Sequence, residues 1–157
     1  MKSHNIMTIK IGRNLLPQKS NFTQTKTAFR VNSEMLTLYW EIGNSILEKQ
    51  NENGWGSKVI DLLASDLAKN FPENSGFSVR NLKYMRAFAK AYPQFPIVQV
   101  PLAHSKNKFV QVPLAQITWY HHISLLSKVK DTTKRAYYIA ESAKNEWSRD
   151  VMQLTIN

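Results

Sequence analysis

The chain has 157 residues, no cysteine and a formal net charge of +10, and 43% of its residues are hydrophobic. This length is enough to bury one core, while the lack of cysteine excludes a disulfide framework and a thiolate metal site, and no apolar run approaches the roughly 20 residues of a membrane span. These bounds predict a soluble, cytoplasmic, single-domain protein whose surplus of positive charge favours a polyanionic partner.

The positive charge is concentrated in two blocks. Residues 1–32 contain six Lys or Arg, residues 78–130 contain eight, and neither block contains an acid. We interpret residues 1–19 as a basic flexible arm and residues 20–157 as a helical domain. The polar, acid-free composition of the first block is equally typical of a mitochondrial transit peptide, so composition leaves both interpretations open.

The first predicted element is a long helix over about residues 22–50. Apolar residues recur along it every three or four positions, which is the spacing of one helix face. They are Met35, Leu38, Tyr39, Ile42 and Ile46. Gly54 suits the left-handed position that ends such a helix, and Ser57 suits the N-cap of the next one.

A second helix is predicted from Ser57 to about Phe71, where Pro72 ends it, and a third follows an N-cap at Ser78. The second helix is expected to bury Val59, Ile60, Leu63 and Leu67. At 100° per residue, the third helix has an apolar arc opposite a basic arc. The apolar arc contains Leu82, Met85, Phe88, Ala89 and Tyr92, and the basic arc contains Arg80, Lys83, Arg86 and Lys90.

A short duplication follows, because residues 98–103 and 110–115 have the same sequence, Val-Gln-Val-Pro-Leu-Ala. Two copies are too few for a solenoid, so the 98–115 segment forms either a short β-hairpin or a loop of no regular structure. Three further helices are predicted, over about residues 118–128, 132–145 and 149–155. The second of these is expected to turn Ala136, Ile139, Ala140 and Ala143 inward, and Ser148 is the expected N-cap of the last. The expected fold class is all-α with five to six helices.

An ordered series of motifs resembles the N-terminal domain of the YhcG family over about residues 20–155. The motifs are Leu38-Tyr39-Trp40-Glu41-Ile42-Gly43, Gly54-Trp55-Gly56, Asp66-Leu67, Phe71-Pro72, Gly76-Phe77-Ser78-Val79-Arg80-Asn81-Leu82, Met85-Arg86, Tyr92-Pro93, Trp119-Tyr120-His121-His122 and Trp147-Ser148-Arg149-Asp150-Val151-Met152. In that family such a helical domain precedes a PDDEXK-type nuclease domain and is thought to bind DNA. The resemblance therefore implies a helix-turn-helix-like core and DNA as the partner. The chain departs from the family where residues 98–115 look inserted, where Glu146 replaces a common glycine, and in lacking the nuclease domain.

The nuclease motif is missing from the chain. A PDDEXK site needs an upstream aspartate and a Glu-x-Lys or Gln-x-Lys pair to hold Mg²⁺. No Glu-x-Lys occurs, and Gln24-Thr25-Lys26 has no aspartate before it. His121 and His122 cannot chelate one ion together, because neighbouring helical residues point about 100° apart, so we interpret them as packed or capping residues. We expect no catalytic residue, no metal and no cofactor.

The DNA contacts are expected on the third helix, with support from the duplicated segment. The candidate residues are Arg80, Asn81, Lys83, Arg86, Lys90, Lys106 and Lys108. The cations are expected to meet phosphates, and Asn81 or Tyr84 is expected to approach bases or sugars. The alternative is that the basic residues of the third helix only form a solvated face and bind no partner. We assign the four tryptophans to the core rather than to base stacking, namely Trp40, Trp55, Trp119 and Trp147. For Arg149, a contact with the DNA backbone and an ion pair with a neighbouring residue both remain open.

A second function is compatible with the same sequence. Glu34, Glu41 and Glu48 repeat every seven residues along helix 22–50, as one flank of a coiled-coil seam does. The chain would then be a protein-interaction or dimerisation module, pairing with a copy of itself or with a nuclease subunit. Salt-sensitive DNA binding would separate the two functions.

Overall fold

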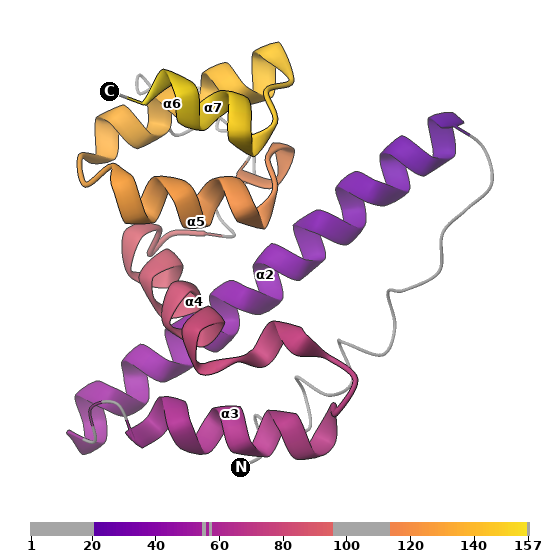
Figure 1. Cartoon of the computed structure of the whole chain (residues 1–157). Helices are drawn as coiled ribbons and strands as arrows, with labels where there is room; N and C mark the ends of the chain where they lie inside the picture. Colours follow the sequence, from indigo (N-terminus) through magenta and orange to yellow (C-terminus); the bar gives the residue numbers. More distant parts are fainter. Residues whose placement is uncertain (1–20, 55, 57, 96–113, 157) are drawn as a thin grey trace. The chain divides into compact units, whose positions relative to one another are not determined.

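The computed structural model describes residues 21–54, 56, 58–95 and 114–156, with side chains from residue 28 onward except that of Asn53. This part of the chain contains six α-helices, two short 3-10 helices and no strand (Figure 1). The helices are α2 (Asn21–Asn53), α3 (Lys58–Asn70), η1 (Ser75–Phe77), α4 (Val79–Ala91), η4 (Leu114–Gln116), α5 (Trp119–Lys128), α6 (Thr132–Asn145) and α7 (Arg149–Thr155). The predicted all-α class is confirmed.

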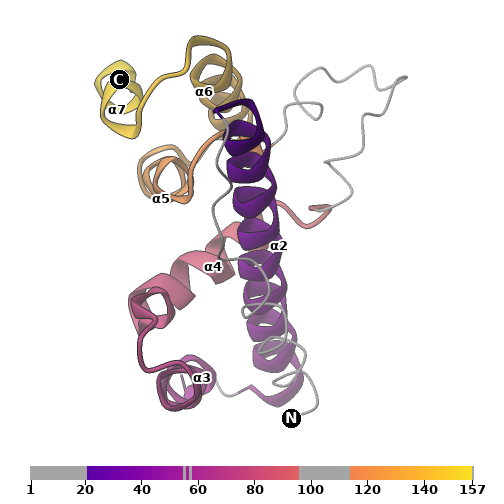
Figure 2. The same ribbon diagram turned by 90° about the vertical axis from the view of Figure 1, so that its right-hand side faces the viewer.

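The helices form two compact units that divide between Lys90 and Ala91. The N-terminal unit contains α2, α3, η1 and all of α4 except its last residue, and the C-terminal unit contains η4, α5, α6 and α7. Figure 2 shows the helices of each unit from a second side. The predicted boundary between the basic arm and the helical domain, at residues 19 and 20, lies outside the described residues.

The corner after α2 is built by two glycines. Gly54 has a φ of 61°, the left-handed conformation that glycine adopts without steric cost, and its amide donates to the carbonyl of Gln50 at 3.0 Å. Gly56 has a φ of 55°, and its carbonyl accepts a hydrogen bond from the Gln50 side chain at 2.5 Å. The predicted end of α2 at Gly54 is confirmed, whereas Ser57, the expected cap of α3, lies outside the described residues.

The backbones of α2 and α4 approach each other closely at Gly43. A methyl group on this glycine would overlap with the carbonyl of Met85 and would lie 3.0 Å from the amide nitrogen of Arg86. This close contact orients α4 so that its apolar face points into the core of the N-terminal unit. The fully buried side chains of this core are Leu36, Ile42, Ile46, Ile60, Leu82, Met85 and Phe88. Leu63, which was expected to be buried, is only half-buried.

Three hydrogen bonds from side chains hold the connection between α3 and α4, which runs from Phe71 to Ser78. The Oδ1 atom of Asn74 accepts from the amide of Gly76 at 2.8 Å, and Nδ2 of Asn81 donates to the Gly76 carbonyl at 2.6 Å. The Oγ atom of Ser78 accepts from the amide of Asn81 at 3.1 Å, as an N-cap does. The predicted cap at Ser78 is confirmed.

Each α-helix of the C-terminal unit begins with a side-chain cap. Thr118 and His121 form a reciprocal capping box at the start of α5. The carboxylate of Asp131 accepts from the amide of Lys134 at 2.8 Å at the start of α6, and Ser148 caps α7 as predicted. Local capping thus explains why α6 and α7 have the bounds that the sequence predicted. The helix α5 contacts both α6 and α7.

Glu146 has a positive φ of 53° just after α6. Its amide and that of Trp147 both donate to the carbonyl of Ser142, which closes the end of the helix. A left-handed residue in this position is most often glycine, because a Cβ atom crowds the backbone there. The structure therefore gives a physical reason for the glycine that the YhcG family commonly has in place of Glu146.

One expectation for the C-terminal unit is only partly tested, and another needs correction. Leu114 and Ala115, the last residues of the duplication, lie buried in η4 and not in a strand, while residues 98–113 lie outside the described part of the chain. In α6 the face that includes Ile139 is buried as expected, but the alanines beside it are only half-buried. The other buried α6 residues are polar, Arg135 and Ser142, which the hydrophobic pattern did not indicate.

Candidate nucleic-acid interface

The side of α4 opposite its buried face is basic. Arg80, Lys83 and Lys90 are all exposed, and α4 contains no acidic residue. At 1.5 Å per residue, Arg80 and Lys90 are separated by about 15 Å along the helix axis. We call these three side chains the outer arc of α4.

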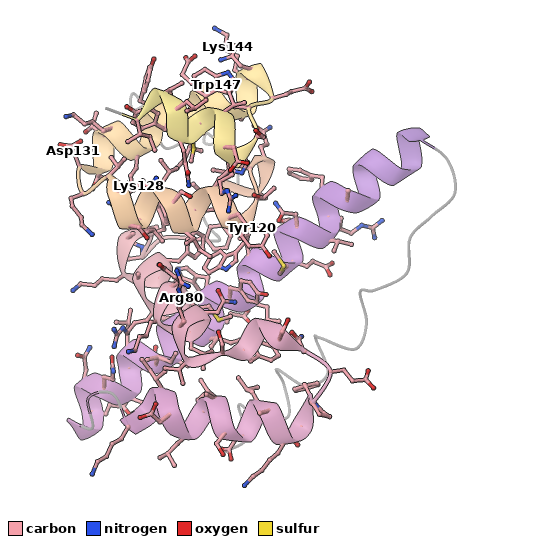
Figure 3. All side chains as sticks on the ribbon, in the orientation of Figure 1. Arg80, Tyr120, Lys128, Asp131, Lys144 and Trp147 are labelled. Atoms are coloured by element: carbon pink, nitrogen blue, oxygen red, sulfur yellow. The ribbon has the colours of Figure 1, made fainter. Side chains whose placement is uncertain are left out.

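Arg80 is partly oriented by its own helix. Its guanidinium carbon lies 5.9 Å from the ring centroid of Tyr84, one turn further along α4, which is within the range of a cation–π contact. Arg80 is exposed and Tyr84 is half-buried. Figure 3 shows the Arg80 side chain on α4. The ring therefore favours particular orientations of a cation that remains accessible to solvent.

Arg86 differs from the outer arc. It is half-buried, and its Nη1 atom lies 3.4 Å from Oε1 of Gln50 on α2. Because the same Gln50 amide group also donates to Gly56, it links the end of α2 to α4. The helix period already indicated that Arg86 lies at the edge of the basic side, because it is about 120° from Arg80 around the helix axis. Gln50 itself was missed, because nothing near it in sequence indicates a partner on α4.

Asn81 lies on the inner side of α4. Its side chain is half-buried, and its Nδ2 atom donates to the carbonyl of Gly76 at 2.6 Å. This hydrogen bond closes the corner that starts α4. The remaining candidates, Lys106 and Lys108, lie outside the described residues.

The two adjacent histidines are structural, as the sequence predicted. The Nδ1 atom of His121 caps α5 through Thr118, and its Nε2 atom lies 2.8 Å from the carbonyl of Trp147. His122 is fully buried with Nε2 2.8 Å from the Leu114 carbonyl, and this burial lowers its pKa from 6.5 to about 4. Among the described residues, no group of three His, Cys, Asp or Glu side chains could hold a metal ion.

A buried cation stabilises the C-terminal unit. Arg135 is only 8% exposed, and its Nη1 atom donates to the carbonyls of Val129 and Lys130 at 3.0 and 3.1 Å. These carbonyls follow α5, where a positive charge interacts favourably with the helix dipole. Burial raises the pKa of Tyr92, and the nearby Arg135 partly opposes this rise. Arg135 is therefore assigned to folding rather than to a ligand.

The tryptophans and Arg149 can now be placed. Trp119 is buried, in agreement with the predicted core role, and Trp40 and Trp147 are half-buried. Trp55 lies outside the described residues. Arg149 forms an ion pair with the adjacent Asp150, with Nη2 and Oδ1 2.7 Å apart. Both side chains of this ion pair are exposed, and a contact of Arg149 with the DNA backbone is not tested.

In the described part of the chain, no helix combines the length and the apolarity needed to cross a bilayer. The family model of the DUF1016 N-terminal domain matches residues 18–157. No curated protein and no solved structure matches the chain. The matched span contains the motifs that resemble the N-terminal domain of the YhcG family. It also contains the helices of the N-terminal unit and the capped helices of the C-terminal unit of this chain. The chain therefore belongs to the family of DUF1016 N-terminal domains.

Proposed function

We propose that this protein is a DNA-binding module of the cytoplasm that contacts DNA phosphates with the outer arc of α4 and does not itself catalyse a reaction. The observation that supports this function is the outer arc, because three exposed cations lie on a helix without acids, within a segment of 53 residues, 78–130, that also has none. Such a cluster attracts the phosphate backbone through the release of counterions.

The residues of the outer arc have a defined role in this proposal. Arg80, Lys83 and Lys90 meet phosphates, and Arg86 adds positive charge from the edge of the arc. Asn81 acts by holding the corner that starts α4, so we no longer assign it a base contact. Lys106 and Lys108 add phosphate contacts. The resemblance to the YhcG family adds the finer proposal that the module positions a nuclease on DNA.

Salt dependence is the measurement that tests the function. The three cations of the outer arc alone correspond to a slope of about −2.7 in a plot of log K against log salt, so affinity should fall at least about 40-fold between 50 and 200 mM salt. Contacts by Lys106 and Lys108 would make the slope steeper. Fluorescence anisotropy with labelled duplex, branched and single-stranded DNA provides the affinities. The double variant Lys83→Glu, Lys90→Glu should abolish binding.

A matched control separates the outer arc from net charge. The variant Lys49→Glu, Lys69→Glu changes the charge by the same amount at two exposed positions of the same unit, on α2 and α3. It should retain most of the binding, and circular dichroism should show that both double variants are folded. Absence of salt-sensitive binding to all three DNA forms would overturn the function. Equal losses in the two double variants would overturn the assignment to α4.

A further inference from the structure

The N-terminal part of α2 extends beyond α3 and α4, the other α-helices of the N-terminal unit. α2 has 33 residues and is about 50 Å long. In both views, α3 and α4 lie beside its middle and its C-terminal part, and neither reaches its first turns (Figures 1 and 2). Within the described side chains of α2, the first buried one is Leu36, and Phe29 is 46% exposed. Near this end of the helix, Phe29 is therefore an apolar side chain that is exposed to solvent.

An apolar stripe runs along α2 from this end. Phe29, Trp40 and Leu47 lie within about 20° of one another at 100° per residue. Phe29 is exposed, and the other two are half-buried. The side chains of the stripe are therefore only partly buried. The stripe is long enough for a second helix to lie along it.

The order of charges along α2 favours an antiparallel neighbour. Its first ten residues contain the bases Lys26 and Arg30, and its acids follow them, at Glu34, Glu41, Glu48 and Glu52. The first turn has no acid and the last turn has no base, so neither end has the charge that the helix dipole favours. A second α2 in the opposite direction would cancel the dipole and would place bases beside acids.

We propose that two copies of this chain associate through antiparallel α2 helices, with Arg30 of each copy opposite Glu48 of the other. In this register Leu47 of the second copy is offset from Phe29 by two residues, about 3 Å along the helix axis. On the same flank it places two further acids opposite uncharged residues, Glu34 opposite Asn44 and Glu41 opposite Thr37. No two acids face each other.

The geometry of the flanks distinguishes antiparallel from parallel association. Arg30 and Glu48 each lie about 100° from the apolar stripe and on the same side of it. Antiparallel helices bring like sides together, whereas parallel helices bring opposite sides together. Arg30 and Glu48 of two copies can therefore meet only in the antiparallel arrangement. This inference is independent of the proposed DNA binding.

Sedimentation of the full chain without DNA tests the dimer. Arg30→Glu alone and Glu48→Arg alone should each raise the dimer dissociation constant about tenfold or more, because two attractive contacts become repulsive. An equimolar mixture of the two single variants should form a heterodimer of nearly wild-type affinity, since each repulsive contact is then replaced by a Glu–Arg pair. The double variant Arg30→Glu, Glu48→Arg should also dimerise.

The control is Lys49→Glu, an exposed change of the same charge on the opposite side of α2, which should leave the dissociation constant unchanged. A wild-type chain that stays monomeric over a wide concentration range contradicts the proposal. So does a dimer that is insensitive to Arg30→Glu, or a mixture of the single variants that fails to recover association.

Discussion

Replacing Gly43 by alanine tests the close contact between α2 and α4, on which the orientation of the outer arc depends. The new methyl group would overlap with the carbonyl group of Met85 and would lie 3.0 Å from the amide nitrogen of Arg86. All of these atoms belong to the backbone of α4, so no side chain can rotate away to make room. The two helices would have to separate or bend.

The size of the effect follows from two opposing contributions. Overpacking a core costs about 1–3 kcal/mol, and a clash with backbone atoms belongs in the upper part of that range. Alanine is favoured over glycine in a helix by about 1 kcal/mol, which offsets part of the cost. We therefore expect Gly43→Ala to lower the free energy of unfolding by about 1–2 kcal/mol.

Urea unfolding, followed by tryptophan fluorescence and circular dichroism, measures this difference. Asn51→Ala is the control, because Asn51 is exposed on the same helix and alanine there should be neutral or slightly stabilising. A Gly43→Ala variant as stable as the wild type, or more stable, would refute the close approach of the two helices.

Two further predictions concern the C-terminal unit. Burial lowers the pKa of His122 to about 4 in the folded protein, from 6.5 in the unfolded chain. The contribution of neutral His122 to the free energy of unfolding should therefore be complete above pH 6.5. It should fall by up to about 3 kcal/mol as the pH drops toward 4, because the unfolded chain then binds a proton that the folded protein does not. Urea unfolding from pH 7.5 to 4 should show a smaller loss for His122→Gln, and an identical pH dependence would contradict this origin. Glu146→Gly should raise the free energy of unfolding by about 0.5–1 kcal/mol, because the residue has a positive φ. Glu146→Ala, which keeps the strain, should give no such gain in the same assay.

The limits of the helices were predictable because they depend on residues that are close in sequence. Gly54 ends α2 with a hydrogen bond four residues back, and Ser148 caps α7 with one three residues ahead. The apolar arc of α4 was also predictable, since the helix period alone groups its members. For the same reason the outer arc, with Arg80, Lys83 and Lys90 exposed, was correctly placed on the side away from the core.

Contacts between distant segments were not predictable in the same way. Gly43 looks like a weak point in a helix until the backbone of Met85 is beside it, and Gln50 is 36 residues from its partner Arg86. Arg135 looks like a surface cation, yet it is buried, and its Nη1 atom donates to the carbonyls of Val129 and Lys130 in the turn after α5. These partners are close in sequence, but the hydrophobic pattern does not indicate that a cation is buried.

By itself the sequence determined the all-α class, the caps and the basic side of α4, because helix period, capping and charge are properties of neighbouring residues. Only the tertiary structure decided which candidate side chains are accessible. It left Arg80, Lys83 and Lys90 in solvent, and it engaged Arg86 and Asn81 in contacts within the fold. The reason is that accessibility depends on which segments pack together, and packing joins residues that no local pattern connects.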